Sequence, residues 1–176
     1  MEVILIRHTS VDVPPGVCYG QTDVALKATF PEEAAATQAQ LEAYMPFDKV
    51  YCSPLSRCVK LATYCGYSDA ERDERLLEMN MGAWEMKEFD KIDDPRLEEW
   101  YADFLHVATT GGESFEELLH RVSAFLDELK GKSYQRVAIY AHGGVLISAQ
   151  IYAGTLRMEN AFEGLTPYGS IVRIEI

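Results

Sequence analysis

The chain has 176 residues, a length that favours one domain with a sizeable core. Its composition, 48% hydrophobic and 25% charged, is that of an ordinary soluble globular protein. The net charge of −12 sets up a field that repels polyanions, so we expect neither nucleic acid nor an anionic membrane surface as a partner.

The cysteines and the amino terminus bear on redox state and targeting. Cys18, Cys52, Cys58 and Cys65 lack the paired C-x-x-C spacing that is typical of zinc sites. The apolar run at the amino terminus is too short for a signal peptide, and no segment approaches the roughly 18 apolar residues of a membrane span. We therefore expect a cytoplasmic protein with reduced thiols.

The first apolar run, Val3 to Ile6, is followed at once by Arg7 and His8. A run this short without alternation predicts a strand that is buried on both faces, as in parallel sheets. In open α/β sheets, ligands bind just beyond the carboxyl ends of the strands. Arg7 and His8 are therefore either ligand-binding residues or simply the point where the strand meets water.

A long loop from Thr9 to Ala28 comes next, and a loop of that length in a compact domain favours a function. The capping-box spacing of Thr29 and Glu32 then predicts a helix that runs to about Tyr44.

Lys49 to Cys52 predicts a second short strand, and Ser53-Pro54 predicts that a helix starts directly after it, with Ser53 as N-cap. Arg57 falls in the first turn of that helix, where the helix dipole disfavours a cation. An anion bound at the helix terminus would explain this position. The alternative is a solvated surface arginine.

Glu78 lies in an otherwise apolar run, after a possible short strand from Arg72 to Leu77. A carboxyl group among apolar neighbours keeps its proton more readily than one in water, which suits a proton donor. On the pattern alone, a surface glutamate is the more frequent explanation.

The segment of about 84–111 predicts a small helical cap over the edge of the sheet. Asp94-Pro95 opens a helix there, and the aromatic stripe between Leu97 and Leu105 is more often core than ligand cage. Ser114 to Glu117 is a capping box, and it predicts a helix that ends at Gly131.

Arg136 to Ala141 predicts a third strand, followed by His142-Gly143-Gly144 and a helix from Val145 to about Ala153. The tail, Ser170 to Ile176, alternates apolar and polar residues like an edge strand. No repeat or linker divides the chain, so we expect one α/β domain over residues 1–176. The expected architecture is a three-layer α/β/α sandwich with a mostly parallel sheet, helices on both faces and the small cap.

The three strands should deliver Arg7, His8, Arg57 and His142 to one edge of the sheet. Two guanidinium and two imidazole groups favour a compact, multiply charged anion, and phosphate fits best. A metal site is the alternative, because histidine is a common metal ligand. The arginines would repel a divalent cation and no acidic cluster accompanies the histidines, so we expect no metal.

The same residues carry a resemblance to a known family. The chain resembles the histidine phosphatase (phosphoglycerate mutase-like) superfamily in an ordered motif set, which comprises Leu5–His8, Ser53–Arg57, Leu76–Glu78 with Gly82 and Trp84-Glu85, Gly112–Ser114 and Ala141–Gly144. Within that family, the Cys18–Asp23 loop and the Gly82–Glu85 stretch most resemble α-ribazole phosphatases, which act in assembling the nucleotide loop of cobalamin. Thr9 and Met86 stand where the family usually has glycine.

The resemblance implies a phosphomonoesterase that needs no cofactor and acts on a small phosphomonoester, with α-ribazole 5′-phosphate as the expected substrate. It implies that His8 attacks phosphorus and forms a phosphohistidine. Arg7, Arg57 and His142 would stabilise the phosphoryl oxygens, and Glu78 would protonate the leaving group. The substrate-binding residues that it implies are Arg7, Thr9, Gln21, Thr22, Arg57, His142 and Gly143.

Three alternatives stay open at this point. A broad-specificity small-molecule phosphatase would use the same residues. A phosphoglycerate mutase would return the phosphoryl group to its substrate, although 176 residues is short for a mutase. A non-catalytic phospho-ligand binding module would lack a nucleophile or an acid, yet His8 and Glu78 are both present. A homodimer is also left open.

Overall fold

The computed structural model describes the whole chain, residues 1–176. Five strands form a single sheet in the order β3-β2-β4-β1-β5. Their bounds are β1 Glu2–Arg7, β2 Lys49–Cys52, β3 Glu71–Arg72, β4 Arg136–Ala141 and β5 Ile171–Glu175. The first four run parallel to one another, and β5 pairs antiparallel with β1 at the edge. The predicted fold class is therefore confirmed.

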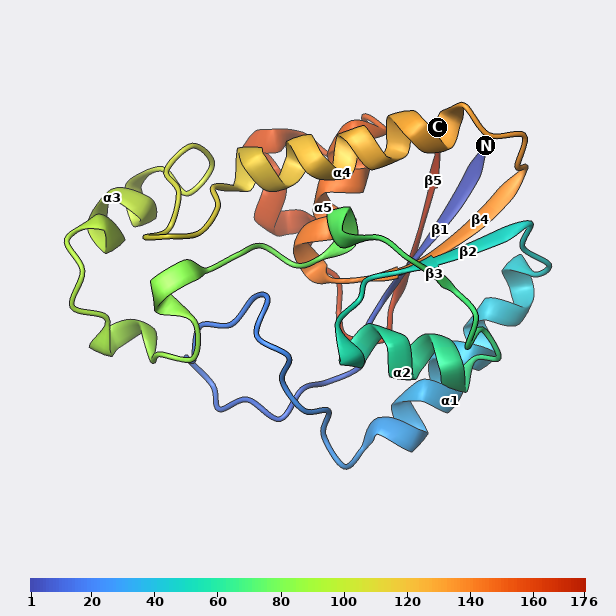
Figure 1. Cartoon of the computed structure of the whole chain (residues 1–176), viewed down its shortest axis with the longest axis horizontal. Coiled ribbons are helices and arrows are strands. Elements are labelled where there is room, and N and C mark those ends of the chain that lie inside the picture. The colour runs from blue at the N-terminus through green and yellow to red at the C-terminus, as the bar shows by residue number, and fades with distance from the viewer.

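The helices pack on both faces of this sheet (Figure 1). They are α1 Phe30–Leu41, α2 Ser56–Tyr64, α3 Arg96–Ala102, α4 Phe115–Lys130 and α5 Gly143–Tyr152. Helices α1 and α2 cover one face, α4 and α5 cover the other, and α3 lies away from the sheet at the far end of the molecule (Figure 1). None of the helices combines the length and the apolar character that crossing a membrane would require.

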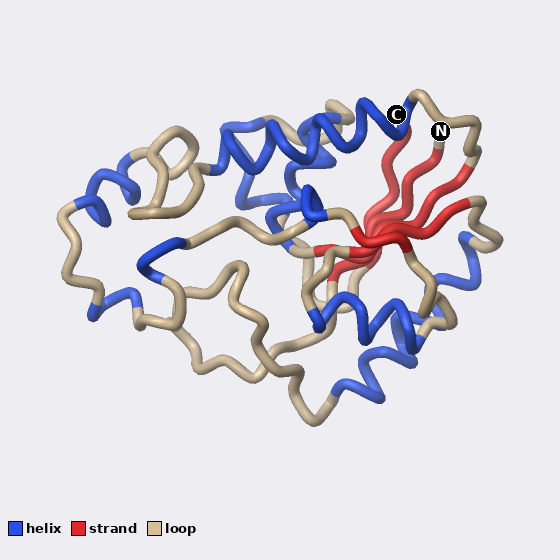
Figure 2. The backbone as a smooth tube through the Cα atoms, in the orientation of Figure 1, coloured by secondary structure: helices blue, strands red, loops and turns tan.

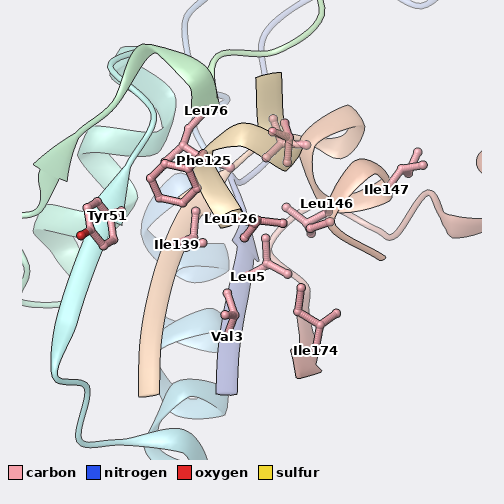
Figure 3. Close-up of a cluster of buried hydrophobic side chains, with 14 of the residues drawn as sticks. Val3, Leu5, Tyr51, Leu76, Phe125, Leu126, Ile139, Leu146, Ile147 and Ile174 are labelled. Atoms are coloured by element: carbon pink, nitrogen blue, oxygen red, sulfur yellow. The ribbon is translucent and has the colours of Figure 1, made fainter. Parts of the chain in front are cut away.

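Strand β1 shows why its sequence is apolar without alternation. Val3 and Leu5 point into the cluster that α4 and α5 cover, whereas Ile4 and Ile6 point into the cluster beneath α1 and α2. Both faces of the strand are thus shielded from water, as the apolar run predicted. Figure 3 shows the first cluster, in which Leu5 lies beneath side chains of α4 and α5. Burying each such side chain contributes about 1.5–3 kcal/mol.

Several predicted helix boundaries are confirmed. The capping box of Ser114 and Glu117 starts α4, and Gly131 ends it. Asp94 accepts a hydrogen bond from the backbone N–H of Arg96 at the start of α3. Pairing along β5 confirms the predicted edge strand.

One predicted helix start is confirmed and another is wrong. Helix α1 has Thr29 as its N-cap, as predicted, although the Thr29 hydroxyl donates to Glu33 and no capping box with Glu32 forms. Helix α2 begins at Ser56 rather than at Pro54, because Ser53 belongs to the turn that precedes it and its hydroxyl serves another partner, described below.

The predicted strand from Arg72 to Leu77 is also wrong beyond its first residue. The Asp73 side chain accepts from the N–H of Arg75 and caps a 3₁₀ helix over Glu74–Leu76. Such a local side-chain bond competes with strand pairing and ends β3 early.

The segment 84–111, predicted as a cap, extends away from the sheet as short helices joined by loops (Figures 1 and 2). Its two ends meet, because Ala83 donates to the Thr110 carbonyl at 2.8 Å. Gly112 allows this approach, since a Cβ there would lie 2.2 Å from the Asn80 carbonyl oxygen. Trp84 is buried at the base of the segment and donates to Asp94.

Candidate functional site

The register of the two central strands positions the two histidines. Arg7 at the end of β1 pairs with Ala141 at the end of β4, so His8 and His142 follow at the same level of the sheet. Their ring centroids are 5.1 Å apart, and the side chains are almost wholly buried, at 2% and 0% exposed. His8 and His142 therefore lie side by side although they are 134 positions apart in the sequence, the same separation as between the paired residues Glu2 and Arg136. Parallel strands bring their carboxyl ends to one edge of the sheet.

His8 is held as a neutral imidazole with one defined tautomer. Its Nδ1 lies 2.8 Å from the carbonyl oxygen of Thr9, which can only accept, so Nδ1 carries the proton and Nε2 keeps its lone pair. Burial, followed by the positive charge of Arg57, lowers the pKa of His8 to about 3, although the bond to Thr9 opposes this. A neutral imidazole with a free Nε2 is a competent nucleophile.

Arg7 lies beside His8 and offers unused donors. One terminal nitrogen donates to the Thr166 carbonyl, and the guanidinium carbon lies 4.2 Å from the centre of the Tyr168 ring. The Nε atom of Arg7 is buried without a hydrogen-bond partner. The Thr9 hydroxyl is also buried without one, and Thr9 is hydrogen-bonded to His8 through its carbonyl.

Arg57 is 0% exposed, which excludes the surface-arginine interpretation. Its terminal nitrogens donate to the carbonyls of Thr22 at 2.9 Å and Gly20 at 2.5 Å. Its Nε donates to Nδ1 of His142 at 3.3 Å. All three nitrogens of this guanidinium therefore have acceptors that carry no full negative charge.

His142 is neutral as well. Because its Nδ1 accepts from Arg57, its Nε2 carries the proton and donates to the Ser53 hydroxyl at 2.7 Å. Burial, followed by Arg57 and His8, lowers the pKa of His142 well below its ordinary range. Ser53 therefore orients His142, a role that the sequence analysis missed when it made Ser53 a helix cap.

The loop that holds Arg57 is fixed by Glu85. That carboxylate accepts from the backbone N–H groups of Gly20 and Gln21, at 2.9 and 2.8 Å, and from the Thr22 hydroxyl at 2.8 Å. Burial raises the pKa of Glu85, but these hydrogen bonds outweigh it and lower the pKa overall. Gln21 and Thr22 were expected to bind substrate, yet the structure gives both side chains partners within the protein.

Glu78 is the carboxylate that lines the same cavity as His8. It accepts from the N–H of Met79 at 2.9 Å and from the N–H of Gly144, at the start of α5, at 3.1 Å. Gln21 and Arg121 each donate to its main-chain carbonyl, which fixes the backbone from two sides. The sequence analysis did not single out Arg121, which lies among charged residues on α4.

Gly143 and Gly144 form the first turn of α5, which begins two residues before the predicted start at Val145. A Cβ at Gly143 would lie 2.7 Å from Leu165 and 3.4 Å from the guanidinium carbon of Arg7. A Cβ at Gly144 would lie 2.4 Å from a Glu78 carboxylate oxygen. Both glycines therefore permit a close approach to residues of the site.

The cavity beyond His8 and Glu78 has a volume of about 260 Å³ and is mostly apolar. Trp100, Phe104 and Phe162 line it, and the same three rings line a neighbouring groove of about 560 Å³. Trp100 and Phe104 of the predicted aromatic stripe thus line a cavity. Phe162 and Tyr168 come from a carboxyl-terminal segment without periodicity, and no signal in the sequence pointed to them.

No three His, Cys, Asp or Glu side chains gather in a way that could hold a metal ion. The charged groups that converge on the site are the two arginines and Glu78.

The buried neutral histidines predict how stability changes with pH. Below the ordinary histidine pKa of 6.5, the unfolded chain binds protons at His8 and His142 that the folded chain does not. The free energy of unfolding should therefore fall as the pH drops from 6.5 to 5, by up to about 1.4 kcal/mol per pH unit for each histidine. Denaturant titrations across this range measure it.

A matched pair of variants isolates the effect. His8→Gln should remove about half of the pH dependence in this range, whereas His120→Gln, at an exposed position on α4, should leave it unchanged. An undiminished slope in His8→Gln would show that His8 is not neutral in the folded protein.

Comparison with known proteins agrees with this geometry. The family model described as "Histidine phosphatase superfamily (branch 1)" matches residues 3–176. The adenosylcobalamin/alpha-ribazole phosphatase of Escherichia coli (strain K12) is 30% identical over 156 residues, which is 83% of this chain and 75% of that protein. Phosphoserine phosphatase 1 of Hydrogenobacter thermophilus is 25% identical over 150 residues, or 81% of this chain and 71% of that protein.

Among solved structures, the alpha-ribazole phosphatase from Shigella flexneri aligns with a TM-score of 0.88 at 27% identity, covering 100% of this chain and 91% of that one. The family model spans nearly the whole chain. The chain belongs to the histidine phosphatase superfamily and is a phosphatase.

Proposed function

We propose that this phosphatase hydrolyses α-ribazole 5′-phosphate through a phosphohistidine intermediate on His8. The observation that carries the mechanism is the neutral His8 with its free Nε2, which lines one cavity with Arg7 and Glu78. No group in this arrangement needs a cofactor to act.

In the first step, Nε2 of His8 attacks phosphorus in line with the ester oxygen. The new N–P bond forms as the P–O ester bond breaks, and the leaving oxygen takes a proton from Glu78. In the second step, Glu78 removes a proton from water, and the resulting hydroxide displaces His8 and releases inorganic phosphate. The presence of Glu78 and His8 in the lining of one cavity supports this assignment.

The transferring phosphoryl group carries charge on its outer oxygens, and stabilising that charge is the main task of such a site. Arg7 has a buried, unpartnered Nε that can donate to one oxygen. The cation of Arg57 lies behind His142 in a site from which water is largely excluded. Electrostatic attraction is stronger in such surroundings than in water.

The lining of the cavity favours a substrate whose leaving group carries an aromatic base over a substrate that carries a second carboxylate. Arg7 is its only cation, so the carboxylate of phosphoserine or phosphoglycerate would have no partner once phosphate occupies that arginine. The rings of Trp100, Phe104 and Phe162 can instead stack on the base of a nucleoside. The alpha-ribazole phosphatases among the similar proteins point to the same substrate. The segment 84–111 acts as the cap over this base, because Trp100 and Phe104 belong to it.

A substrate panel tests the assignment. The value of kcat/KM should be about 5- to 150-fold higher for α-ribazole 5′-phosphate than for phosphoserine or 3-phosphoglycerate, two stacked rings being worth about 1–3 kcal/mol in total. The measurement is the rate at which inorganic phosphate is released.

Two variants test the role of the aromatic rings. Trp100→Ala should lose most of this preference, whereas Tyr64→Ala on α2, which does not line the cavity, should keep it. Equal rates on all three substrates would indicate a broad-specificity phosphatase, and isomer formation without phosphate release would indicate a mutase.

Glu78→Gln tests the proton donor. The amide keeps the size of the side chain but cannot protonate a basic alkoxide, so the burst of phosphoenzyme formation from an alkyl phosphate should slow by about 10²–10⁴-fold. p-Nitrophenyl phosphate has a good leaving group, and its burst should change far less. Equal damage with both substrates would show that Glu78 has a structural role only.

Gly144→Ala tests the placement of Glu78 without changing its chemistry. The added methyl group would lie 2.4 Å from the Glu78 carboxylate and must displace it. We expect turnover of an alkyl phosphate to fall at least about tenfold, in line with the loss of an oriented general acid. Gly131→Ala, at the end of α4, is the control and should retain full activity. Full activity in Gly144→Ala would contradict the proposed role of this contact.

A further inference from the structure

Two tyrosines meet on the exposed side of the phosphate site. The hydroxyls of Tyr19 and Tyr168 lie 2.7 Å apart, although these residues are 149 positions apart in the chain. Tyr168 comes from the loop before β5, and Tyr19 comes from the long loop after β1. The hydrogen bond between them therefore joins the two segments that border the site.

Each ring also faces one of the two arginines. The guanidinium carbon of Arg7 lies 4.2 Å from the centre of the Tyr168 ring, and that of Arg57 lies 5.6 Å from the centre of the Tyr19 ring. Tyr168 further contacts His8, with ring centroids 5.5 Å apart. The pair thus spans both cations and one face of the nucleophile.

The chemistry of these contacts suits a site that must receive an anion. Neither Arg7 nor Arg57 forms a salt bridge with a carboxylate; their partners are main-chain carbonyls, His142 and the two tyrosine rings. The negative face of an aromatic ring stabilises a guanidinium without a full negative charge. A carboxylate in the same place would repel the incoming phosphate, and a tyrosine ring does not.

The backbones on both sides are fixed, so the hydroxyl bond sets the spacing of the rings. Gly169 donates to the His8 carbonyl at 3.1 Å, and Arg7 donates its N–H to the Ser170 carbonyl at 3.0 Å. On the other side, Cys18 donates to the Lys87 carbonyl at 2.8 Å. Burial, followed by the bond to Tyr168, raises the pKa of Tyr19, which keeps its hydroxyl protonated at neutral pH.

We propose that Tyr19 and Tyr168 are positioning residues that act as one unit, with the hydroxyl bond holding the Tyr168 ring against Arg7 so that this guanidinium is placed for phosphate, while Arg57 is fixed by its own hydrogen bonds. This inference rests on the proposed function only in requiring that phosphate binds beside Arg7. It does not depend on the identity of the leaving group.

Phenylalanine variants test the hydroxyl bond, and the probe is competitive inhibition by inorganic phosphate of p-nitrophenyl phosphate hydrolysis. Tyr19→Phe and Tyr168→Phe should each raise the inhibition constant and KM by about threefold to tenfold, the worth of one hydrogen bond, while kcat changes less than about twofold. The double variant should be no worse than either single variant, because both remove the same bond.

Two further variants complete the test. Tyr168→Leu, which also removes the ring from Arg7, should weaken phosphate binding more than Tyr168→Phe. Tyr64→Phe, on the same helix as Arg57 and without a hydroxyl partner in the structure, should bind phosphate like the unchanged protein.

The proposal would be overturned by additive losses in the double variant, by unchanged phosphate binding in both single variants, or by tighter binding, which would make the pair a barrier to entry. All of these outcomes can be interpreted even if the proposed substrate is wrong, because the measurement is the binding of inorganic phosphate.

Discussion

The site depends on keeping two histidines neutral beside two buried guanidinium groups. Burial and the neighbouring arginines lower the pKa values of His8 and His142, and no carboxylate forms a salt bridge with either arginine to counteract this. The arginines are stabilised instead by carbonyl oxygens, an imidazole nitrogen and tyrosine rings. Positive charge therefore remains available for an anion, while the nucleophile keeps its lone pair.

The pairing of the central strands fixes the positions of the two histidines relative to each other. The alignment of Arg7 with Ala141 fixes where β1 and β4 end, and the helix that starts at Gly143 brings a backbone N–H to Glu78. The long loop contributes the carbonyls of Gly20 and Thr22 to Arg57, and Glu85 holds that part of the loop by its backbone. The buried network around Arg57 is consequently assembled from segments that lie far apart in the sequence.

The sequence analysis succeeded where local patterns were strong. The apolar run of β1 and the capping box of α4 predicted the elements of the fold correctly. The positions of Arg7, His8 and His142 at strand ends indicated which edge of the sheet holds the site. It failed where the decisive contact is long-range: Ser53 resembled a helix cap, yet its hydroxyl serves His142. Phe162 and Tyr168 lie in a segment without periodicity, and only the fold brings them to the site.

The central claim is that His8 carries the phosphoryl group during turnover. Enzyme quenched during hydrolysis of a radiolabelled phosphomonoester measures this most directly, followed by mapping of the labelled residue. The account predicts an acid-labile, base-stable phosphate on His8 and no label in His8→Ala, with the fold retained in that variant. Label that persists in His8→Ala, or turnover without any trapped phosphoenzyme in a rapid quench, would contradict it.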